Sequence, residues 1–394
     1  MTDLRAWWWH RQGLDGSLDG EDPATVLART GWARSVGGAN PYLTLFARAG
    51  VHRAEVDGAV ADLAVHELPS ARGCTYVVPA ADFGLALQVG RSAPEADLAR
   101  VAKLGVPRGE IDELRAAVLD AVAAGPLDPV ALKDVLGDAV RNLGAAGKKQ
   151  GVSTTLPVAL GLLQASGDLR RIPVGGRLDQ QRYSYARWDR PDSGLSDDAA
   201  RVSLVRRYLG WTGGAGVAHV RWFTGFTARV VKAALAELAP VEVAEGVLAL
   251  PADAKAFAEF VAPARPRYAL LGGIDGLFLL RRDLSSLLDD GSAPVPGEDR
   301  TIGQFTDLPD HAIVDRGRLV GLWQFDVDSS RIVWWTWDPA LATDPDLVSE
   351  VERTAAYIRD ELGDARGFSL DSPKSRAPRI AALSAASGDG RVRR

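Results

Sequence analysis

The stretch from Thr154 to Trp188 constrains the fold of this chain more than any other segment. Leucines at helical spacing predict a helix that ends at Ser166, and the residues after it read as two strands around a Val174-Gly175-Gly176 turn. The strands and their turn carry the arginines Arg170, Arg171, Arg177, Arg182 and Arg187. A helix followed by an arginine-rich β-ribbon is typical of a winged helix, in which the helix enters a nucleic-acid groove and the ribbon contacts phosphates.

Polar residues of this region are therefore candidate DNA contacts. We expect the basic side chains of the ribbon at phosphates, and the two glutamines near its turn at bases or sugars. A basic loop before the helix and the threonines at the helix start extend the same surface. The predicted DNA-binding residues are Lys148, Lys149, Thr154, Thr155, Arg170, Arg171, Arg177, Gln180, Gln181 and Arg182.

The net charge of the chain is −5, so a uniformly positive surface is excluded and the local distribution of charge matters more than the total. Between Leu169 and Arg190 six arginines stand against two aspartates. From Ser372 to Arg394 six basic residues stand against Asp389 alone. We expect the ribbon to bind DNA, whereas for the C-terminal segment a solvated, loosely held tail is an equal alternative.

A chain of 394 residues is longer than one hydrophobic core usually serves, so two or three domains are expected. The pattern of helices and short strands predicts an α+β, mainly helical fold, with tandem winged-helix motifs and a small C-terminal β-rich domain. The hairpin of the third unit carries Glu242 and Glu245, which suit a structural role better than phosphate binding. The expected units are a first winged-helix-like unit at 1–92, a second winged helix with the basic wing at 93–192, a third winged-helix-like unit at 193–262, the β-rich domain at 263–371 and a basic tail at 372–394.

Composition also bears on compartment and cofactors. No run approaches the roughly 20 apolar residues that span a bilayer, and no basic N-terminal region precedes an apolar stretch, so we expect a cytoplasmic protein located at the nucleoid. The single cysteine, Cys74, excludes an internal disulfide and a cysteine metal cluster. The five histidines are too scattered for an evident metal site. We expect neither a metal nor a cofactor.

Several segments, in the same order along the chain, resemble the crosslink-repair DNA glycosylases of the AlkZ/YcaQ type. They are Asn40–Gly50, His66–Leu68, Thr75–Phe83, Ala269–Asp283 and Gly317–Gly321. The matching pieces span roughly the whole chain, which makes the resemblance more specific than any one motif. It implies tandem winged helices with a small C-terminal β domain, together with excision of bulky N7-alkylated purines and unhooking of interstrand crosslinks.

The resemblance also implies a catalytic motif of glutamine, any residue, then glutamine or aspartate, just before the Pro-Tyr-Leu helix. An alkylated purine is a cationic leaving group, so the enzyme must hold a water near C1′ and stabilise positive charge with a carboxylate or amide oxygen. No glutamine lies between Gln12 and Gln88, so the motif is missing. Asn40 and Glu67 are the candidate catalytic substitutes. His66 is either an acid/base partner of Glu67 or a hydrogen-bonded structural histidine.

Three functions are compatible with these observations. The first is a DNA-binding protein related to these glycosylases that no longer excises bases. The second is an active glycosylase in which Asn40 or Glu67 places the water. The third is a winged-helix transcription regulator, which would read a defined operator rather than a lesion. The expected partner is double-stranded DNA, damaged or crosslinked in the first two cases, bound by a monomer.

Overall fold

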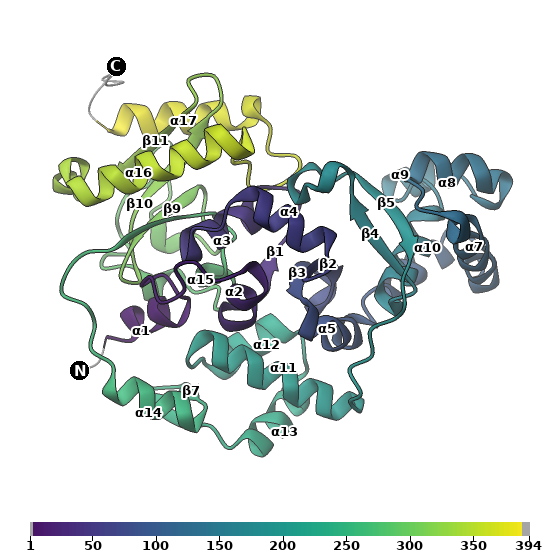
Figure 1. Cartoon of the computed structure of the whole chain (residues 1–394), viewed down its shortest axis with the longest axis horizontal. Helices are drawn as coiled ribbons and strands as arrows, with labels where there is room; N and C mark the ends of the chain where they lie inside the picture. Colours follow the sequence, from purple (N-terminus) through teal and green to yellow (C-terminus); the bar gives the residue numbers. More distant parts are fainter. Residues whose placement is uncertain (1–2, 388–394) are drawn as a thin grey trace.

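The computed structural model describes residues 3–387 of the chain (Figure 1). Helices dominate, and the strands of the described part form four antiparallel sheets of three, four, two and two strands. The predicted α+β, mainly helical fold class is therefore confirmed. No helix between residues 3 and 387 combines the length and the apolar character needed to cross a membrane.

The first region contains a small sheet surrounded by helices. Its helices are α1 (Leu4–Arg11), α2 (Pro23–Thr30), α3 (Asn40–Ala49), α4 (Arg53–Ala61) and α5 (Phe83–Gly90), and its strands are β1 (Ala33–Arg34), β2 (Val65–Pro69) and β3 (Thr75–Pro79). The valines of β2 and β3 are fully buried, and branched side chains favour extended backbone. The sequence pattern predicts β3 but misses β2, with which it pairs antiparallel. We call β2, β3 and the turn between them the first hairpin.

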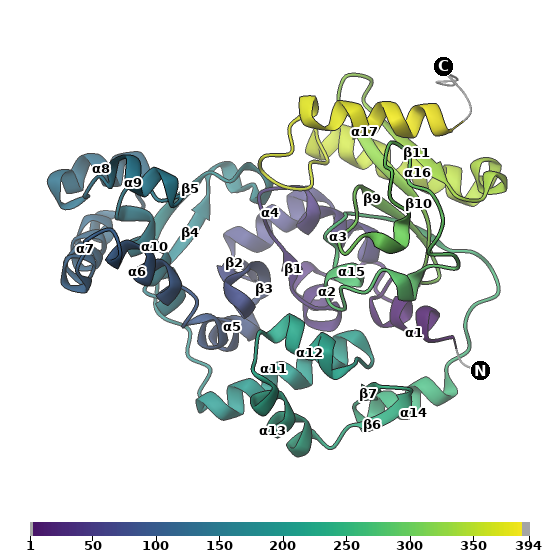
Figure 2. The same cartoon turned by 180° about the vertical axis from the view of Figure 1, so that it is seen from behind.

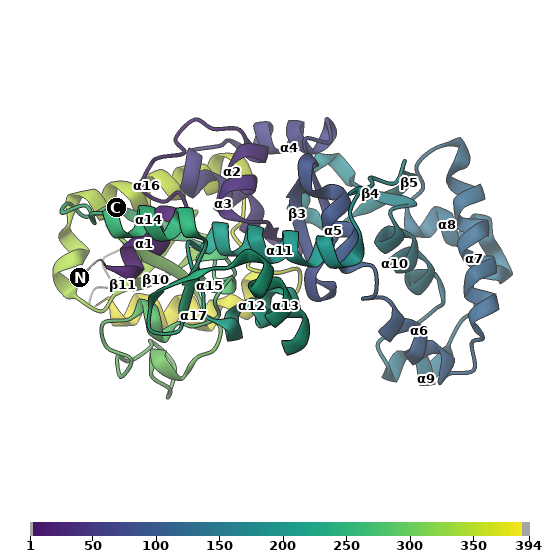
Figure 3. The ribbon, with the colours of Figure 1, turned by 90° about the horizontal axis from the view of Figure 1, so that it is seen from below.

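The second region forms a lobe at one end of the molecule (Figures 1 and 3). It contains α6 (Glu95–Ala102), α7 (Arg108–Ala121), α8 (Pro129–Leu136), α9 (Gly144–Lys149), α10 (Leu156–Ser166), β4 (Leu169–Pro173) and β5 (Tyr183–Arg187). Helix α10 ends at Gly167, whose φ of 77° suits a residue without a Cβ. The antiparallel pairing of β4 with β5 confirms the predicted ribbon. We call residues 169–187 the wing and residues 177–182 the wing tip.

The third region repeats the order of helices followed by a hairpin. It contains α11 (Asp197–Thr212), α12 (Val217–Thr224), α13 (Ala228–Leu238), β6 (Val241–Ala244), β7 (Val247–Ala249) and α14 (Pro251–Glu259). Ser196 caps α11 by accepting a hydrogen bond from the Ala199 amide.

The C-terminal region is built on a four-stranded sheet in the order β11-β10-β9-β8. Its strands are β8 (Tyr268–Leu271), β9 (His311–Asp315), β10 (Arg318–Asp326) and β11 (Arg331–Thr336), and its helices are α15 (Gly276–Leu279), α16 (Pro345–Tyr357) and α17 (Pro373–Ala386). Helices α16 and α17 pack against this sheet (Figure 2).

A loosely held basic tail is the expectation for residues 372–394, and it is wrong for residues 373–386, which form α17. Ser372 caps this helix by accepting a hydrogen bond from the Ser375 amide. Arg376 is fully buried and lies 2.7 Å from a carboxylate oxygen of Asp364. The basic side chains here hold the fold together instead of forming a free tail. Residues 388–394 of the prediction lie outside the described residues.

The hydrophobic cores cross the predicted unit boundaries. Buried residues of the first region share one core with Trp323 and Phe325 of the C-terminal sheet, and another with Tyr208 and Trp211 of the third region. By contrast, the buried residues of two further cores all lie between residues 98 and 169, inside the second region. The second region therefore has cores of its own and shares Leu178 of the wing tip with the core of the first and C-terminal regions. The exact unit boundaries stay predictions.

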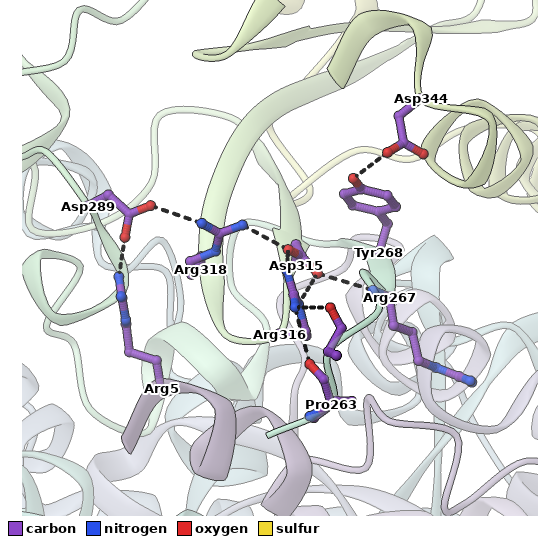
Figure 4. A network of polar contacts seen from close by, with 10 residues as sticks. Arg5, Pro263, Arg267, Tyr268, Asp289, Asp315, Arg316, Arg318 and Asp344 are labelled. Carbon is purple, nitrogen blue, oxygen red and sulfur yellow. Dashed lines mark hydrogen bonds and ion pairs between the residues drawn. The ribbon is translucent and has the colours of Figure 1, made fainter. Parts of the chain in front are cut away.

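A polar network around Asp315 ties distant segments to the C-terminal sheet (Figure 4). The Asp315 carboxylate accepts hydrogen bonds from the side chains of Arg316 and Arg318 and from the Arg267 amide. Burial alone would raise the pKa of Asp315, but these hydrogen bonds outweigh it and hold the pKa below its usual value. Arg318 also reaches Asp289, which accepts a hydrogen bond from Arg5 of α1 at 2.6 Å. The network fixes both α1 and the linker that enters β8.

Candidate nucleic-acid interface

A cleft of about 470 Å³ lies where the first, second and third regions meet. One wall comes from the first hairpin and the connection between α5 and α6, another from α10 and β4, and a third from the end of α12. The lining residues are Pro69, Arg72, Gly73, Thr75, Val89, Gly90, Ser92, Ala93, Pro94, Asp97, Gly161, Gln164, Arg171, Thr224, Gly225 and Phe226. Two guanidinium groups and a single carboxylate lie in this lining, which suits a polyanionic ligand.

Arg72 stands at the tip of the first hairpin. Its φ of 58° is in the left-handed region, which is uncommon for a residue with a Cβ, and its side chain is exposed. The guanidinium carbon lies 3.6 Å from the centre of the Trp222 ring on α12, a cation–π contact that orients the side chain. Within residues 3–387, no carboxylate contacts it. The sequence reading misses Arg72 because it misses β2; the Ser70-Ala71-Arg72-Gly73 turn before β3 is the signal that identifies it.

Arg171 of β4 reaches the same cleft but carries a partner. Its Nε lies 3.3 Å from Oε2 of Glu67, a side chain that is only 2% exposed. The other Glu67 oxygen accepts a hydrogen bond from the Ser35 hydroxyl. The Arg171 guanidinium carbon also lies 4.7 Å from the centre of the Tyr183 ring. Glu67 and Tyr183 thus hold Arg171 in one orientation at the cleft wall.

His66 and Glu67 do not form an acid/base pair, because neighbouring residues on a strand point to opposite faces. The His66 ring packs 5.0 Å from the Trp188 ring and 6.0 Å from the Phe83 ring, centre to centre. Burial, reinforced by the positive charges of Arg171 and Arg170, lowers the pKa of His66 to about 3. His66 is therefore neutral at physiological pH, as a structural histidine would be.

Asn40 is equally enclosed. Its Nδ2 donates a hydrogen bond to the Arg34 carbonyl at 2.9 Å, while its Oδ1 is buried against Gly272, where a Cβ would lie 2.8 Å from that oxygen. Asn40 and Glu67 therefore fix the two ends of the segment 34–40 that precedes the body of α3. Neither of these predicted catalytic side chains lines the cleft.

The wing tip is docked against the rest of the molecule. Arg177 pairs with Asp179 at 2.5 Å and donates a hydrogen bond to the Leu362 carbonyl at 2.8 Å. The Leu178 amide donates to the Tyr42 hydroxyl at 3.0 Å. The side chain of Gln181 covers the backbone of segment 34–40 at Gly37, where a Cβ would lie 2.0 Å from the Gln181 Cγ. The tip thus joins the second region to the first and to the C-terminal region.

The other predicted contacts differ in exposure. Lys148 and Lys149 at the end of α9, with Gln180 and Arg182 at the wing tip, are exposed. Thr154 and Arg170 are half-buried, and burial lowers the pKa of Arg170. Thr155 is fully buried and its hydroxyl accepts a hydrogen bond from the Arg141 amide at 3.1 Å, so the direct DNA contact predicted for it is wrong.

Comparison with known proteins covers almost the whole chain. A family model described as DNA glycosylase AlkZ-like matches residues 28–367. Among solved structures, the Streptomyces sahachiroi DNA glycosylase AlkZ superposes with a TM-score of 0.69 at 19% sequence identity, over 93% of this chain and 98% of that chain. Curated proteins give no match. At this identity the structural likeness establishes the fold, and the family match establishes the relationship.

Proposed function

Because the chain belongs to the AlkZ-like DNA glycosylase family, we propose that it binds double-stranded DNA across the cleft between its first three regions. The observation that carries this proposal is the convergence of Arg72 and Arg171, from two hairpins far apart in sequence, on one cleft. In this proposal the protein binds damaged or crosslinked duplexes as a monomer at the nucleoid.

Arg72 is the main phosphate contact in this proposal. Its guanidinium makes no ion pair within the described part of the chain, whereas that of Arg171 is shared with Glu67. Lysines and arginines that neutralise phosphates release counterions, so affinity falls linearly with salt concentration on a double-logarithmic plot. The test is the binding of a labelled duplex over a salt series. A slope indistinguishable from zero would remove the phosphate-binding proposal.

In this proposal no base of the bound DNA is excised by the glutamine motif that the resemblance implies. Segment 34–40 contains no glutamine, aspartate or glutamate, and its Ser35 and Asn40 side chains donate hydrogen bonds within the protein. The segment therefore lacks the glutamine and carboxylate oxygens with which the family's motif would hold a water near C1′. Incubation with DNA that carries N7-alkylguanine tests this point. We expect no abasic sites above a no-enzyme control, and excision by the wild type would overturn it.

One observation favours an active glycosylase as the second candidate. Glu67 Oε2 is buried and accepts no hydrogen bond from the described residues, and the Nε of Arg171 lies 3.3 Å away as its ion-pair partner. A shift of Arg171 toward a phosphate would open this oxygen to the cleft. In that case the wild type excises the lesion and Glu67→Gln does not. The transcription-regulator alternative predicts instead a defined operator with a large specific-to-nonspecific ratio and no preference for lesions.

A further inference from the structure

The loop between α16 and α17 presents two apolar side chains to solvent. Phe368 is 48% exposed and Leu370 is 83% exposed. Within residues 3–387, Phe368 is the one aromatic group among the large apolar side chains that are exposed. Scattered exposed aliphatic residues are ordinary, but an aromatic and a leucine two positions apart form a small apolar patch.

The backbone that carries this patch is held firmly. The Asp371 carboxylate is buried, accepts a hydrogen bond from the Gly367 amide at 3.1 Å and binds Arg379 at 2.6 Å. Between the two apolar residues, the Ser369 amide donates to the Val36 carbonyl at 3.1 Å. The exposed side chains are therefore displayed from a fixed backbone, so their insertion into a ligand costs little additional backbone entropy.

The loop lies beside the proposed DNA surface. It packs on segment 34–40, since a Cβ on Gly38 would lie 2.4 Å from the Arg366 carbonyl, and Arg366 donates a hydrogen bond to the Asp179 carbonyl of the wing tip. Figures 1 and 2 show the connection between α16 and α17 running down to this junction. At the other end of the same segment, Arg34 donates to the carbonyl of Thr75, a residue that lines the cleft.

We propose that Phe368 and Leu370 form an apolar wedge that enters the base stack of the bound duplex and kinks it. Proteins that bend DNA insert apolar side chains of this kind between base pairs, and the cost of unstacking is offset by the additional surface that the bent duplex contacts. The loop is joined to the cleft through segment 34–40, because the Ser369 amide bonds Val36 and the Arg34 side chain bonds Thr75, and this continuity favours DNA over an apolar protein partner. The inference rests on the proposed DNA binding and adds how the duplex is deformed.

The test separates binding from deformation. A labelled duplex with 2-aminopurine at its centre reports affinity by anisotropy and unstacking by fluorescence, in the wild type and in the double variant Phe368→Ala/Leu370→Ala. We expect the wild type to raise the 2-aminopurine fluorescence about twofold or more on binding. The double variant should lose most of this rise, while its affinity at low salt falls less than about tenfold and its thermal midpoint is unchanged.

Two further variants test whether the fluorescence rise depends on the apolar side chains of this loop. Val261→Ala removes an apolar side chain that is 84% exposed outside the loop, and it should leave the fluorescence rise intact. Phe368→Trp with Leu370→Met keeps apolar volume and should retain the rise. Equal unstacking by wild type and double variant would overturn the wedge while leaving the proposed function in place. Self-association of the wild type that the double variant lacks would overturn it in favour of a contact between copies. Absence of any binding by the wild type would overturn both proposals.

Discussion

The first hairpin and the wing are both β-hairpins beside the same cleft, yet they use their arginines differently. The wing is rich in arginine, but Arg171 is paired with Glu67, Arg177 with Asp179 and Arg187 with Asp120. The first hairpin has one arginine at its tip, and that residue makes no ion pair within residues 3–387. The comparison teaches that the number of basic residues on a hairpin does not measure its ability to bind phosphate.

The physical reason is that a guanidinium bonded to a buried carboxylate has its charge largely compensated. Removing one partner of such a pair leaves the other charge buried and uncompensated, which is strongly destabilising. Arg171 and Arg177 of the wing therefore fasten the second region to the rest of the fold, through Glu67 and the Leu362 carbonyl. The following four experiments test this division of roles.

The largest expected effect is on stability. We expect Glu67→Ala to lower the free energy of unfolding by about 3 kcal/mol, because it leaves the guanidinium of Arg171, 16% exposed, without its carboxylate. Chemical denaturation measures the loss. The matched control is Asp198→Ala, which removes the 91% exposed partner of Arg201 and should change nothing measurable. If Glu67→Ala is as stable as the wild type, the wing is not fastened through this pair.

The second effect is a pH dependence at the same junction. The pKa of His66 is about 3 in the folded protein and rises to the ordinary value of 6.5 on unfolding, so between these values only the unfolded chain binds the proton. The contribution of His66 to stability is fully present above pH 6.5 and is lost as the pH falls toward 3. We expect a loss of roughly 3 kcal/mol at pH 4.5 from this group, two pH units below its unfolded pKa at about 1.4 kcal/mol each. The variant His66→Phe should show a correspondingly weaker acid destabilisation, and identical pH profiles would contradict the assignment.

The third effect concerns DNA affinity directly. We expect Arg72→Ala to weaken duplex binding roughly tenfold at low salt and to reduce the salt slope by about one, with little loss of stability. Arg177→Ala should instead lower the stability and change the affinity and the salt slope little, because the Arg177 guanidinium binds Asp179 and the Leu362 carbonyl within the protein. Anisotropy over a salt series and thermal unfolding measure the two effects. A larger change of slope for Arg177→Ala than for Arg72→Ala would reverse the comparison.

The smallest effect belongs to the exposed lysines of α9. Replacing Lys148 and Lys149 together by alanine should weaken binding by about twofold to fivefold, because exposed charges outside the cleft add only long-range attraction. Electrophoretic mobility shifts at two salt concentrations are sufficient to detect it. An effect greater than that of Arg72→Ala would indicate that the duplex runs along α9 instead of through the cleft.

The sequence predicts what depends on local chemistry. The β-branched run at Thr75–Pro79 and the wing depend on propensity and periodicity, and the structure confirms both as strands. The burial of polar residues is harder to predict from the sequence, because it depends on partners far away in the chain. The hydrogen bond from Asn40 to the Arg34 carbonyl and the ion pair of Glu67 with Arg171 are contacts of this kind, and the catalytic roles predicted for Asn40 and Glu67 stay predictions.

Helix α17 shows the opposite failure of the sequence analysis, in which residues predicted to be exposed are packed in the fold. Its basic, alanine-rich sequence reads as a tail when charge alone is considered, although Ser372-Pro373 is a good helix start. The deciding contacts of Arg376 with Asp364 and of Arg379 with Asp371 connect residues in a loop whose shape the sequence does not reveal. From the sequence alone, Arg376 and Arg379 are predicted to be solvent-exposed, because the positions of their acidic partners are not known.

The separate cores of the second region bear on which parts of the molecule unfold together. Since the buried residues of these cores all lie between residues 98 and 169, the lobe is a cooperative folding unit of its own. Its separation from the rest of the molecule would break the contacts of the wing tip and the Glu67–Arg171 pair, and it would withdraw Leu178 from the core that the first and C-terminal regions share. Because the lobe has cores of its own, we expect it to stay folded if these contacts are lost, which native-state hydrogen exchange of residues 98–169 would show.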